Sequence, residues 1–444
     1  MMFFYPLGTE KRQMLQMKGV HLTRQCLMLL QKATFRSIID DEINIKILTL
    51  KNQAKGGEKV CRGVVYRNHH FLNLTQVGLS PAIQNLSTAT SMKMTKVFQA
   101  FLMLQPQLVD LIHEMQPDCI VSDVFYPWTS DVAAELRIPR LAFNGSSFFS
   151  YCAEQCIKEH KPHLEVESNN EKFKLPGLPD VIEMVRSELP SWITRHKPDG
   201  FSQLLDVIRE SEKRCYGMLM NRFHELEASY EEHLNKIIGI KTWSIGPVSL
   251  LANNEIEDKE SRGGNPNIQT TNLLQWLNEK EPNSVLYINF GSLIQMSRNQ
   301  ITEIAHAIQE SSQSFIWVIK KNDEDNDDDI VNKGLQKGFE ERMSRTKKGL
   351  IIKGWAPQLM ILEHKSVGGF LTHCGWNSIL EGISSGLPMI TWPLFAEQFY
   401  NEKLLIEVVK IGVGVGSKKW WHLGEEPEII KREEIGKAIA FFDG

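Results

Sequence analysis

The sequence predicts an α/β fold made of two doubly wound domains that face a cleft between them. Short strand-like apolar runs alternate with helix-like segments in both halves, which is the pattern of parallel sheets with crossover helices. A polar stretch rich in Asn, Glu and Gly separates the halves and is typical of a linker. We therefore expect a first domain over residues 1–247, a linker over 248–271 and a second domain over 272–444.

Composition narrows the class of protein. The net charge is −4, so there is no overall basic field to hold nucleic acid. The seven cysteines are odd in number and form no pair of CxxC units, which favours a reducing, cytoplasmic setting. No run of about 18 apolar residues is present, so we expect no transmembrane segment. The apolar stretch at the N-terminus is too short for a signal peptide.

The first half contains a short α/β pattern. Asp118–Asp123 is an apolar run bounded by acidic residues, which predicts a buried strand. Trp128–Leu136 has a helical pattern, and Arg140–Phe143 has the composition of a second strand. Asn144 and Ser146 follow that strand, so we expect them at the cleft. Four aromatic residues nearby could line an apolar pocket or belong to the core: Phe125, Trp128, Phe148 and Phe149.

The second half alternates more regularly. Its expected strands are Val285–Phe290, Phe315–Ile319, Leu350–Lys353, Gly368–Thr372 and Pro388–Trp392. Its expected helices are Arg298–Gln309, Pro357–His364 and Asn377–Ser385. The acidic run Asp323–Asp329 is predicted to be a solvated loop. Ligands of such sheets bind beyond the carboxyl ends of the strands, so the strand-to-helix junctions are the places to search for a site.

The junction around His373 has the features of an anion site. An apolar strand leads into a turn containing His373 and Gly375, and a helix opens directly after it. Free backbone N–H groups at a helix start suit a phosphate, and the glycine permits close approach of a ligand. An alternative is that Ser378 and Glu381 form a capping box and the segment only starts a helix.

A second small-residue turn strengthens the phosphate interpretation. Gly291 and Ser292 also follow an expected strand, and two such turns could hold the two phosphates of one ligand. No GxGxxG opens a βα unit, which argues against a nicotinamide-dependent oxidoreductase. No metal-ligand spacing is evident, since His69 and His70 are simply adjacent.

Residues 355–398 read WAPQLMILEHKSVGGFLTHCGWNSILEGISSGLPMITWPLFAEQ. This segment closely resembles the 44-residue signature of plant secondary-product UDP-glycosyltransferases. Milder similarity extends from Asp118 to Gly444 and includes SDVFYPW, WSIGP, YINFGS and FIWVI. The subgroup it resembles most acts on triterpenoids, flavonoids and related aglycones. The resemblance implies a GT-B fold, with two Rossmann-like domains and the sugar donor held mainly by the second.

The resemblance also implies roles for individual residues. Trp355 is expected to stack on uracil, while Ala356 contacts the base through its backbone and Gln358 contacts the base or ribose. His373 is expected at the pyrophosphate with Asn377, Ser378 and Ser292, and Glu381 at the ribose hydroxyls. The sugar is expected among Trp376, Glu397 and Gln398. Gln398 favours UDP-glucose as the co-substrate, with no other cofactor and no metal.

The catalytic base is the point where the chain departs from the family. The family uses a histidine after the first strand, oriented by an aspartate, to take the acceptor proton during inverting transfer. Asp123 matches that aspartate, but Phe3–Pro6, the remnant of the first strand, is followed by Leu7–Arg12 without a histidine. His21 is the nearest candidate, and Glu10 is a weaker one because an ordinary carboxylate is a poor base for an alcohol. A lost or altered N-terminal segment is the expected explanation. The early C-terminus is a second departure from the family, and we expect it to loosen the cleft between the domains.

Two functions therefore remain open. The first is transfer of glucose from UDP-glucose to a hydroxyl of a small lipophilic plant metabolite by a monomeric enzyme. The alternative is a catalytically impaired relative that binds a UDP-sugar or aglycone but lacks the base.

Overall fold

The computed structural model describes residues 105–195, 200–247, 266–294, 296–320, 337–421 and 427–441, together with a few positions between them. Towards the N-terminus it describes only the backbone of four strands, which are β1 (Leu15–Met17), β2 (Val20–Leu22), β3 (Leu48–Lys55) and β4 (Glu58–Val65). Some sequence predictions lie outside the described residues: Phe3–Pro6, Leu7–Arg12, Glu10, His69, His70, Asp323–Asp329 and most of the linker.

The first half is built on a six-stranded sheet in the order β10-β9-β6-β5-β3-β4. Four of its strands are parallel, namely β5 (Cys119–Asp123), β6 (Arg140–Asn144), β9 (Gly217–Met220) and β10 (Lys241–Ser244). The strand beside β5 on the other side, β3, runs antiparallel to it. The apolar runs of β6 and β9 are buried throughout, as expected for strands covered on both faces.

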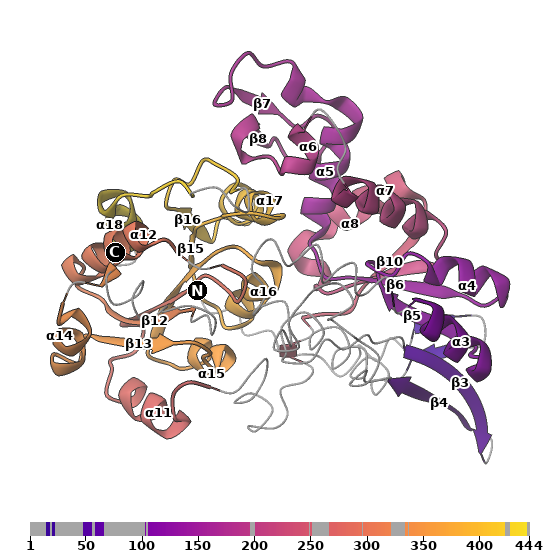
Figure 1. Cartoon of the computed structure of the whole chain (residues 1–444), viewed down its shortest axis with the longest axis horizontal. Helices are drawn as coiled ribbons and strands as arrows, with labels where there is room; N and C mark the ends of the chain where they lie inside the picture. Colours follow the sequence, from indigo (N-terminus) through magenta and orange to yellow (C-terminus); the bar gives the residue numbers. More distant parts are fainter. Residues whose placement is uncertain are drawn as a thin grey trace.

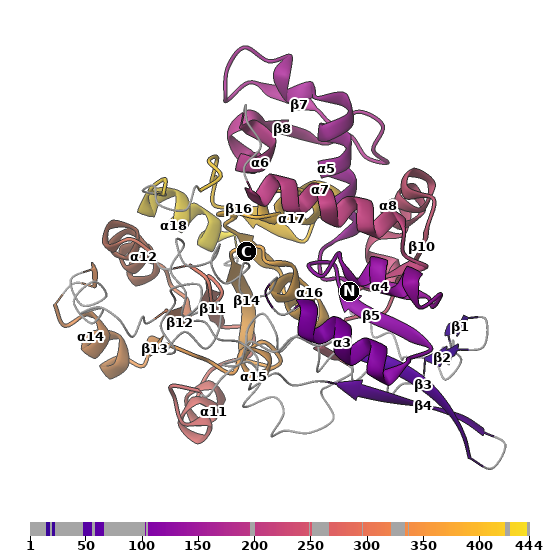
Figure 2. The same ribbon diagram turned by 45° about the vertical axis from the view of Figure 1, so that its right-hand side comes forward.

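Helices of the first half cover this sheet and carry a small projecting lobe. The helices are α3 (Gln105–Met115), α4 (Thr129–Glu135), α5 (Phe148–His160), α6 (Ser191–Thr194), α7 (Gly200–Lys213) and α8 (His224–Ile238). The lobe contains the hairpin of β7 (Lys172–Lys174) and β8 (Glu183–Val185), which lies beyond the end of α5 in Figure 1 and Figure 2.

The second half is a parallel sheet in the order β13-β12-β11-β14-β15-β16. Its strands are β11 (Val285–Asn289), β12 (Ser314–Ile319), β13 (Gly349–Lys353), β14 (Val367–Thr372), β15 (Met389–Thr391) and β16 (Gly412–Gly414). The strand order reverses between β11 and β14, and ligands of doubly wound sheets bind at such a reversal.

Helices lie on both faces of this second sheet. They are α11 (Thr270–Asn278), α12 (Arg298–Glu310), α14 (Phe339–Arg345), α15 (Gln358–Leu362), α16 (Trp376–Ser384), α17 (Gln398–Lys403), the π-helical turn Leu404–Val408, and α18 (Arg432–Ala440). The expected strands and helices of this half are therefore confirmed, with ends that differ by one or two residues.

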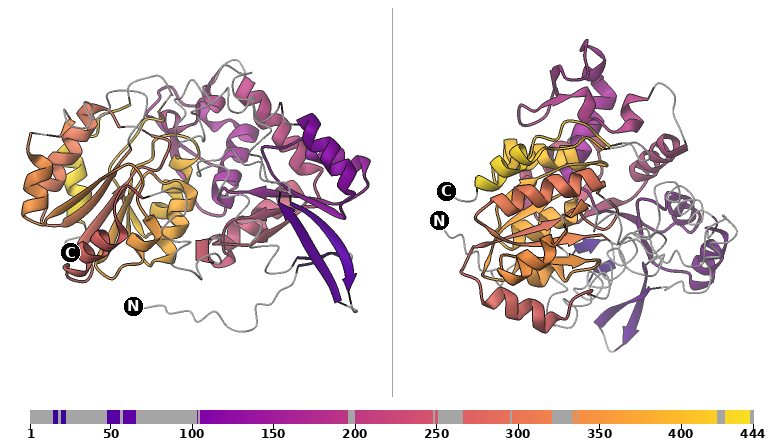
Figure 3. Two further views of the ribbon diagram at one scale, coloured as in Figure 1. Left: turned by 60° about the horizontal axis from the view of Figure 1, so that its bottom comes forward. Right: turned by 60° about the vertical axis from the view of Figure 1, so that its left-hand side comes forward.

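The two sheets belong to separate halves that lie side by side, as the left view of Figure 3 shows. Helix α17 of the second half packs on α5 of the first. Further along the chain, the backbone N–H of Trp420 donates to the carbonyl of Ser187 at 2.7 Å. The rings of Trp420 and Trp192 meet edge to face with centroids 5.7 Å apart. Among the described residues, no helix is both long and apolar enough to cross a membrane.

Candidate active site

Two strand-end turns of the second half form one surface, which we call the strand-end cradle: Gly291, Ser292, His373 and Gly375. The strands before them are neighbours, with Asn289 opposite Thr372. Gly291 has a φ of +75°, and a Cβ there would lie 2.7 Å from the His373 ring. A Cβ on Gly375 would lie 2.5 Å from Nε2 of the same ring. The imidazole is thus held between two glycines, and the predicted meeting of the two turns is confirmed.

His373 is an uncharged donor in this cradle. Its ring is half-buried, and burial lowers the pKa of His373 to about 4. At neutral pH the imidazole therefore carries one N–H and one lone pair. Its Nδ1 has no hydrogen-bond partner among the described residues.

Helix α16 adds backbone donors to the cradle. It begins at Trp376 after Gly375, and no side chain caps it. The capping box of Ser378 and Glu381 is therefore wrong, since both residues lie inside the helix. The first intrahelical bond runs from the N–H of Ile379 to the carbonyl of Gly375, so the earlier N–H groups are not used by the helix. Such a helix start favours an anion.

A chain of side-chain hydrogen bonds joins the cradle to the segment after Trp355. Asn289 accepts from the backbone N–H of Gly291 at 2.9 Å and donates to Gln358 at 2.7 Å. Gln358 then donates to Glu381 at 2.8 Å and to Ser378 at 3.3 Å. Glu381 is buried, so this amide bond balances part of its desolvation. The sequence analysis missed Asn289, although its place at the carboxyl end of a strand was a usable signal.

Trp355 stands at the edge of the same region. It follows β13 after one residue, Gly354, and its side chain is half-buried. Its backbone is fixed by Asn267, whose side chain accepts from the Trp355 N–H at 2.6 Å. The indole Nε1 has no partner among the residues described. Ala356 is buried beside it, and its carbonyl accepts from the N–H of Gln358.

The residues expected near the sugar differ in burial and in whether their side chains already have hydrogen-bond partners. The indole of Trp376 is buried and donates to the carbonyl of Asn221 at 2.8 Å, so only its backbone is left for the cradle. Gln398 is also buried, and its side-chain oxygen accepts from the N–H groups of Leu394 and Phe395. Glu397 is half-buried, and burial raises its pKa.

Asp123 ends β5 at the carboxyl edge of the first sheet. Its Oδ1 accepts from the N–H of Phe125 at 2.9 Å. Burial, aided by the charge of Glu212, raises the pKa of Asp123 to about 6, while the Phe125 N–H and Arg140 oppose the shift. In the described part of the chain no histidine is among its hydrogen-bond or ion-pair partners. The backbone of His21 pairs with Gln16 in the separate β1–β2 hairpin, so the base stays unassigned.

Replacing Asp123 by Asn should stabilise the protein in a pH-dependent manner. The raised pKa means that the folded state holds this proton more tightly than the unfolded chain, so ionisation costs stability as pH rises from about 4 to 6. Asn keeps the acceptor for Phe125 without the charge. The shift from 3.8 to about 6 corresponds to about 3 kcal/mol at most. Urea unfolding from pH 4.5 to 8 measures the free energy of unfolding of both proteins. The excess stability of Asp123→Asn over the wild type should grow up to about pH 6 and then stay constant. An excess that does not change with pH would contradict this.

The structure decides between core and pocket for the aromatic residues of the first half. Trp128, Phe148 and Phe149 are buried, so of the two alternatives the core holds for them; Phe125 is half-exposed. Asn144 is buried too.

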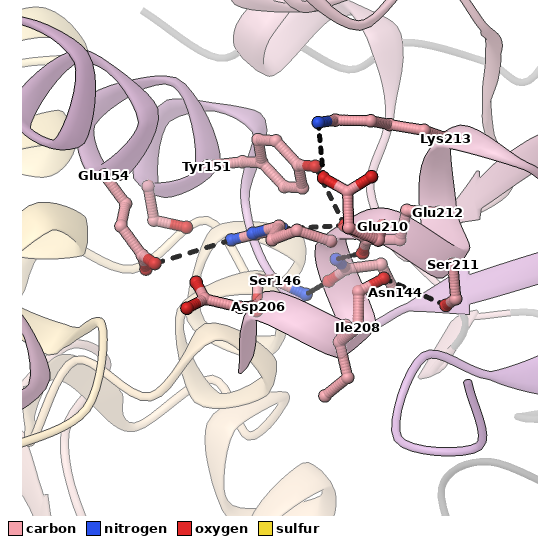
Figure 4. A network of polar contacts seen from close by, with 12 residues as sticks. Asn144, Ser146, Tyr151, Glu154, Asp206, Ile208, Glu210, Ser211, Glu212 and Lys213 are labelled. Atoms are coloured by element: carbon pink, nitrogen blue, oxygen red, sulfur yellow. Dashed lines mark hydrogen bonds and ion pairs between the residues drawn. The ribbon is translucent and has the colours of Figure 1, made fainter. Parts of the chain in front are cut away.

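A buried polar network explains the burial of Asn144 (Figure 4). Asn144 donates to Glu212 at 3.4 Å and accepts from the N–H of Ser146. Glu212 also accepts from Tyr151 at 2.8 Å and from Arg209 at 3.0 Å. Arg209 lies over the Tyr151 ring, 3.7 Å from its centroid. The network fixes the end of β6 beside Asp123. The Asn144 amide is used in these bonds and is therefore not free to bind a ligand.

Among the described residues, no group of three or more His, Cys, Asp or Glu side chains is placed to hold a metal ion. The cradle itself offers neutral and backbone donors, which suit a phosphate ester.

Comparison with known proteins gives a consistent result. Residues 15–416 match the family described as UDP-glucoronosyl and UDP-glucosyl transferase. The soyasapogenol B glucuronide galactosyltransferase of Glycine max is 44% identical over 409 residues, covering 90% of this chain and 81% of that protein. The scopoletin glucosyltransferase of Nicotiana tabacum is 46% identical over 347 residues, covering 78% of this chain and 71% of that protein.

Solved structures agree in fold. Glycyrrhiza uralensis UGT73P12, complexed with glycyrrhetinic acid 3-O-monoglucuronide, is similar with a TM-score of 0.76 and 46% identity, covering 82% of this chain and 73% of that one. Medicago truncatula UGT71G1, complexed with UDP-glucose, has a TM-score of 0.62 and 26% identity, covering 81% of this chain and 74% of that one. With two facing α/β halves and a cradle at the strand reversal, the chain belongs to the UDP-glycosyltransferase family and has its GT-B fold.

Proposed function

We propose that this protein transfers glucose from UDP-glucose to a hydroxyl group of a small lipophilic plant metabolite, such as a triterpenoid, a flavonoid or a phenol. The observation that carries the proposal is the strand-end cradle. A neutral His373 and the free N–H groups of α16 converge where a diphosphate can be bound without a metal. Trp355 supports a site for the uracil base beside the cradle. Its side chain is half-buried, and Gln358, three residues later, is hydrogen-bonded to Asn289 of the cradle's first strand.

The chemistry requires few steps from the protein. The acceptor oxygen attacks the anomeric carbon of glucose, the bond from that carbon to the β-phosphate oxygen breaks, and UDP leaves with the electron pair. Donors in the cradle stabilise the charge that develops on UDP. The acceptor proton must pass to a base, and Asp123 would stabilise a cationic base placed beside it.

A second candidate function follows from the surroundings of Asp123. Its carboxylate accepts a hydrogen bond from the Phe125 backbone N–H, and the adjacent β3 runs antiparallel to β5. The carboxyl end of β3 therefore lies at the opposite edge of the sheet from Asp123. A histidine that followed β3 would therefore not lie beside Asp123. This arrangement is consistent with a protein that binds a UDP-sugar but lacks a base beside Asp123 and turns the sugar over slowly. Loss of a general base costs about 10²–10⁴ in rate.

Calorimetry and product analysis together separate these functions. Titration with UDP-glucose should show binding, and incubation with a hydroxylated triterpenoid or flavonoid should give a glucoside. UDP-galactose is the matched donor control, because one relative is a galactosyltransferase. Binding without product supports the impaired relative, and absence of binding to either donor overturns the proposal.

A further inference from the structure

The turn that follows β14 is held at one end by α17 of the second half, which is itself bonded to the first half, and at the other end directly by the first half. At one end, the Cys374 carbonyl accepts from Asn401 at 3.0 Å, and Asn401 accepts from the hydroxyl of Ser147 at 2.9 Å. At the other end, the Trp376 indole donates to the carbonyl of Asn221 at 2.8 Å. The side chain of Asn221 then donates to Oδ1 of Asn377 at 3.1 Å. The first half therefore contacts the side of the turn that leads into α16.

Asn221 has little freedom to move. It follows β9, is 1% exposed, and its backbone N–H donates to the carbonyl of Asn144. Its Oδ1 faces Gly246, where a Cβ would lie only 2.4 Å from that oxygen. With the oxygen directed at Gly246, the amide nitrogen of Asn221 is the atom that faces Asn377.

This contact determines how Asn377 is oriented. An asparagine amide has an acceptor on one side and two N–H donors on the other. Because Oδ1 of Asn377 accepts from Asn221, its Nδ2 is directed away from Asn221. Asn377 is the second residue of α16, where backbone N–H groups are also free. Its side chain is half-buried, so it keeps access to the cradle.

We propose that Asn221 is a positioning residue for the donor site: its amide orients Asn377 so that the Nδ2 hydrogens of Asn377 point to the donor phosphates. The inference rests on the proposed function for the nature of the ligand. In this proposal Asn221 does not bind the donor itself but acts on it through Asn377. It makes the phosphate-binding end of the second half depend on a residue of the first.

Asn221→Asp tests this inference with almost no change in shape. An aspartate cannot donate to Asn377 and instead attracts its N–H groups, so the Asn377 oxygen would turn towards the phosphates. Hydrogen bonds to charged groups are worth about 1.5–3 kcal/mol, which predicts UDP binding about 10- to 100-fold weaker. Uridine, which lacks phosphates, should bind within about twofold of its affinity for the wild type. Both affinities are measured by calorimetry.

The pattern of losses distinguishes positioning from general loosening. An equal fall for UDP and uridine, or no fall for either, would overturn the inference. In an Asn377→Ala background, Asn221→Asp should cause no further loss of UDP affinity, and an additional tenfold loss would also refute it. Asn235→Asp is the matched control, since Asn235 accepts from Thr242 elsewhere in the first half. If the wild type fails to bind UDP, the proposed function fails instead.

Discussion

Gly291→Ala is expected to weaken UDP-glucose binding about 10- to 100-fold. The new Cβ would lie 2.7 Å from the His373 ring, closer than real side chains approach, so the imidazole must shift from its place in the cradle. The φ of +75° adds backbone strain of about 1–2 kcal/mol for any residue with a Cβ. Loss of a donor to a charged phosphate costs about 1.5–3 kcal/mol, and about 1.4 kcal/mol is tenfold in affinity. Calorimetric titration of the purified variant measures the effect.

Two further glycine variants separate the effect of the contact with the His373 ring from the effect of backbone strain at a positive φ. Gly375→Ala meets the same ring at 2.5 Å but has no positive φ, so it should also lose donor binding. Gly386→Ala has a φ of +71° and no atom within 4 Å of its Cβ, so it should lose some stability yet bind UDP-glucose normally. Wild-type affinity in Gly291→Ala would show that His373 is not needed in its observed place.

Glu227→Gln is expected to destabilise the first half by up to about 3 kcal/mol, because the buried Arg222 loses its nearer carboxylate and keeps the more distant Glu231, 3.7 Å away. Glu227 and Arg222 are both buried, with Nε and Oε2 3.3 Å apart. The guanidinium also lies over the Phe148 ring, 3.4 Å from its centroid, where water cannot reach it. Burial raises the pKa of Glu227 and lowers that of Arg222, and each partner opposes the shift of the other. Glutamine can still accept from the N–H of Phe149, so the variant removes mainly charge.

Urea unfolding followed by tryptophan fluorescence measures this loss. Glu232→Gln on the same helix is the control, because its pair with Lys236 is fully exposed and exposed pairs contribute little. A midpoint for Glu227→Gln equal to that of the control would mean that the buried pair does not stabilise the fold.

Sequence reasoning worked best where a motif carries its own geometry. The strand, turn and helix around His373 are contiguous, so apolar periodicity and the glycines were enough to predict them. Reasoning from spacing failed for the capping box of Ser378 and Glu381, because the helix begins earlier, at Trp376. It left Phe148 and Phe149 open between core and pocket, since an aromatic side chain looks the same in a sequence in either place, and the structure shows them in the core.

The sequence by itself determined the α/β class, the family and the residues that follow the strands of the second half. Tertiary structure alone decided that Gly291 and His373 touch, because that depends on the register between β11 and β14. It also decided that Asn289 links Gly291 to Gln358, and that Asn221 reaches Asn377 from the other half. These contacts join residues far apart in the chain, and only the packing of sheets and helices brings their atoms within hydrogen-bonding distance.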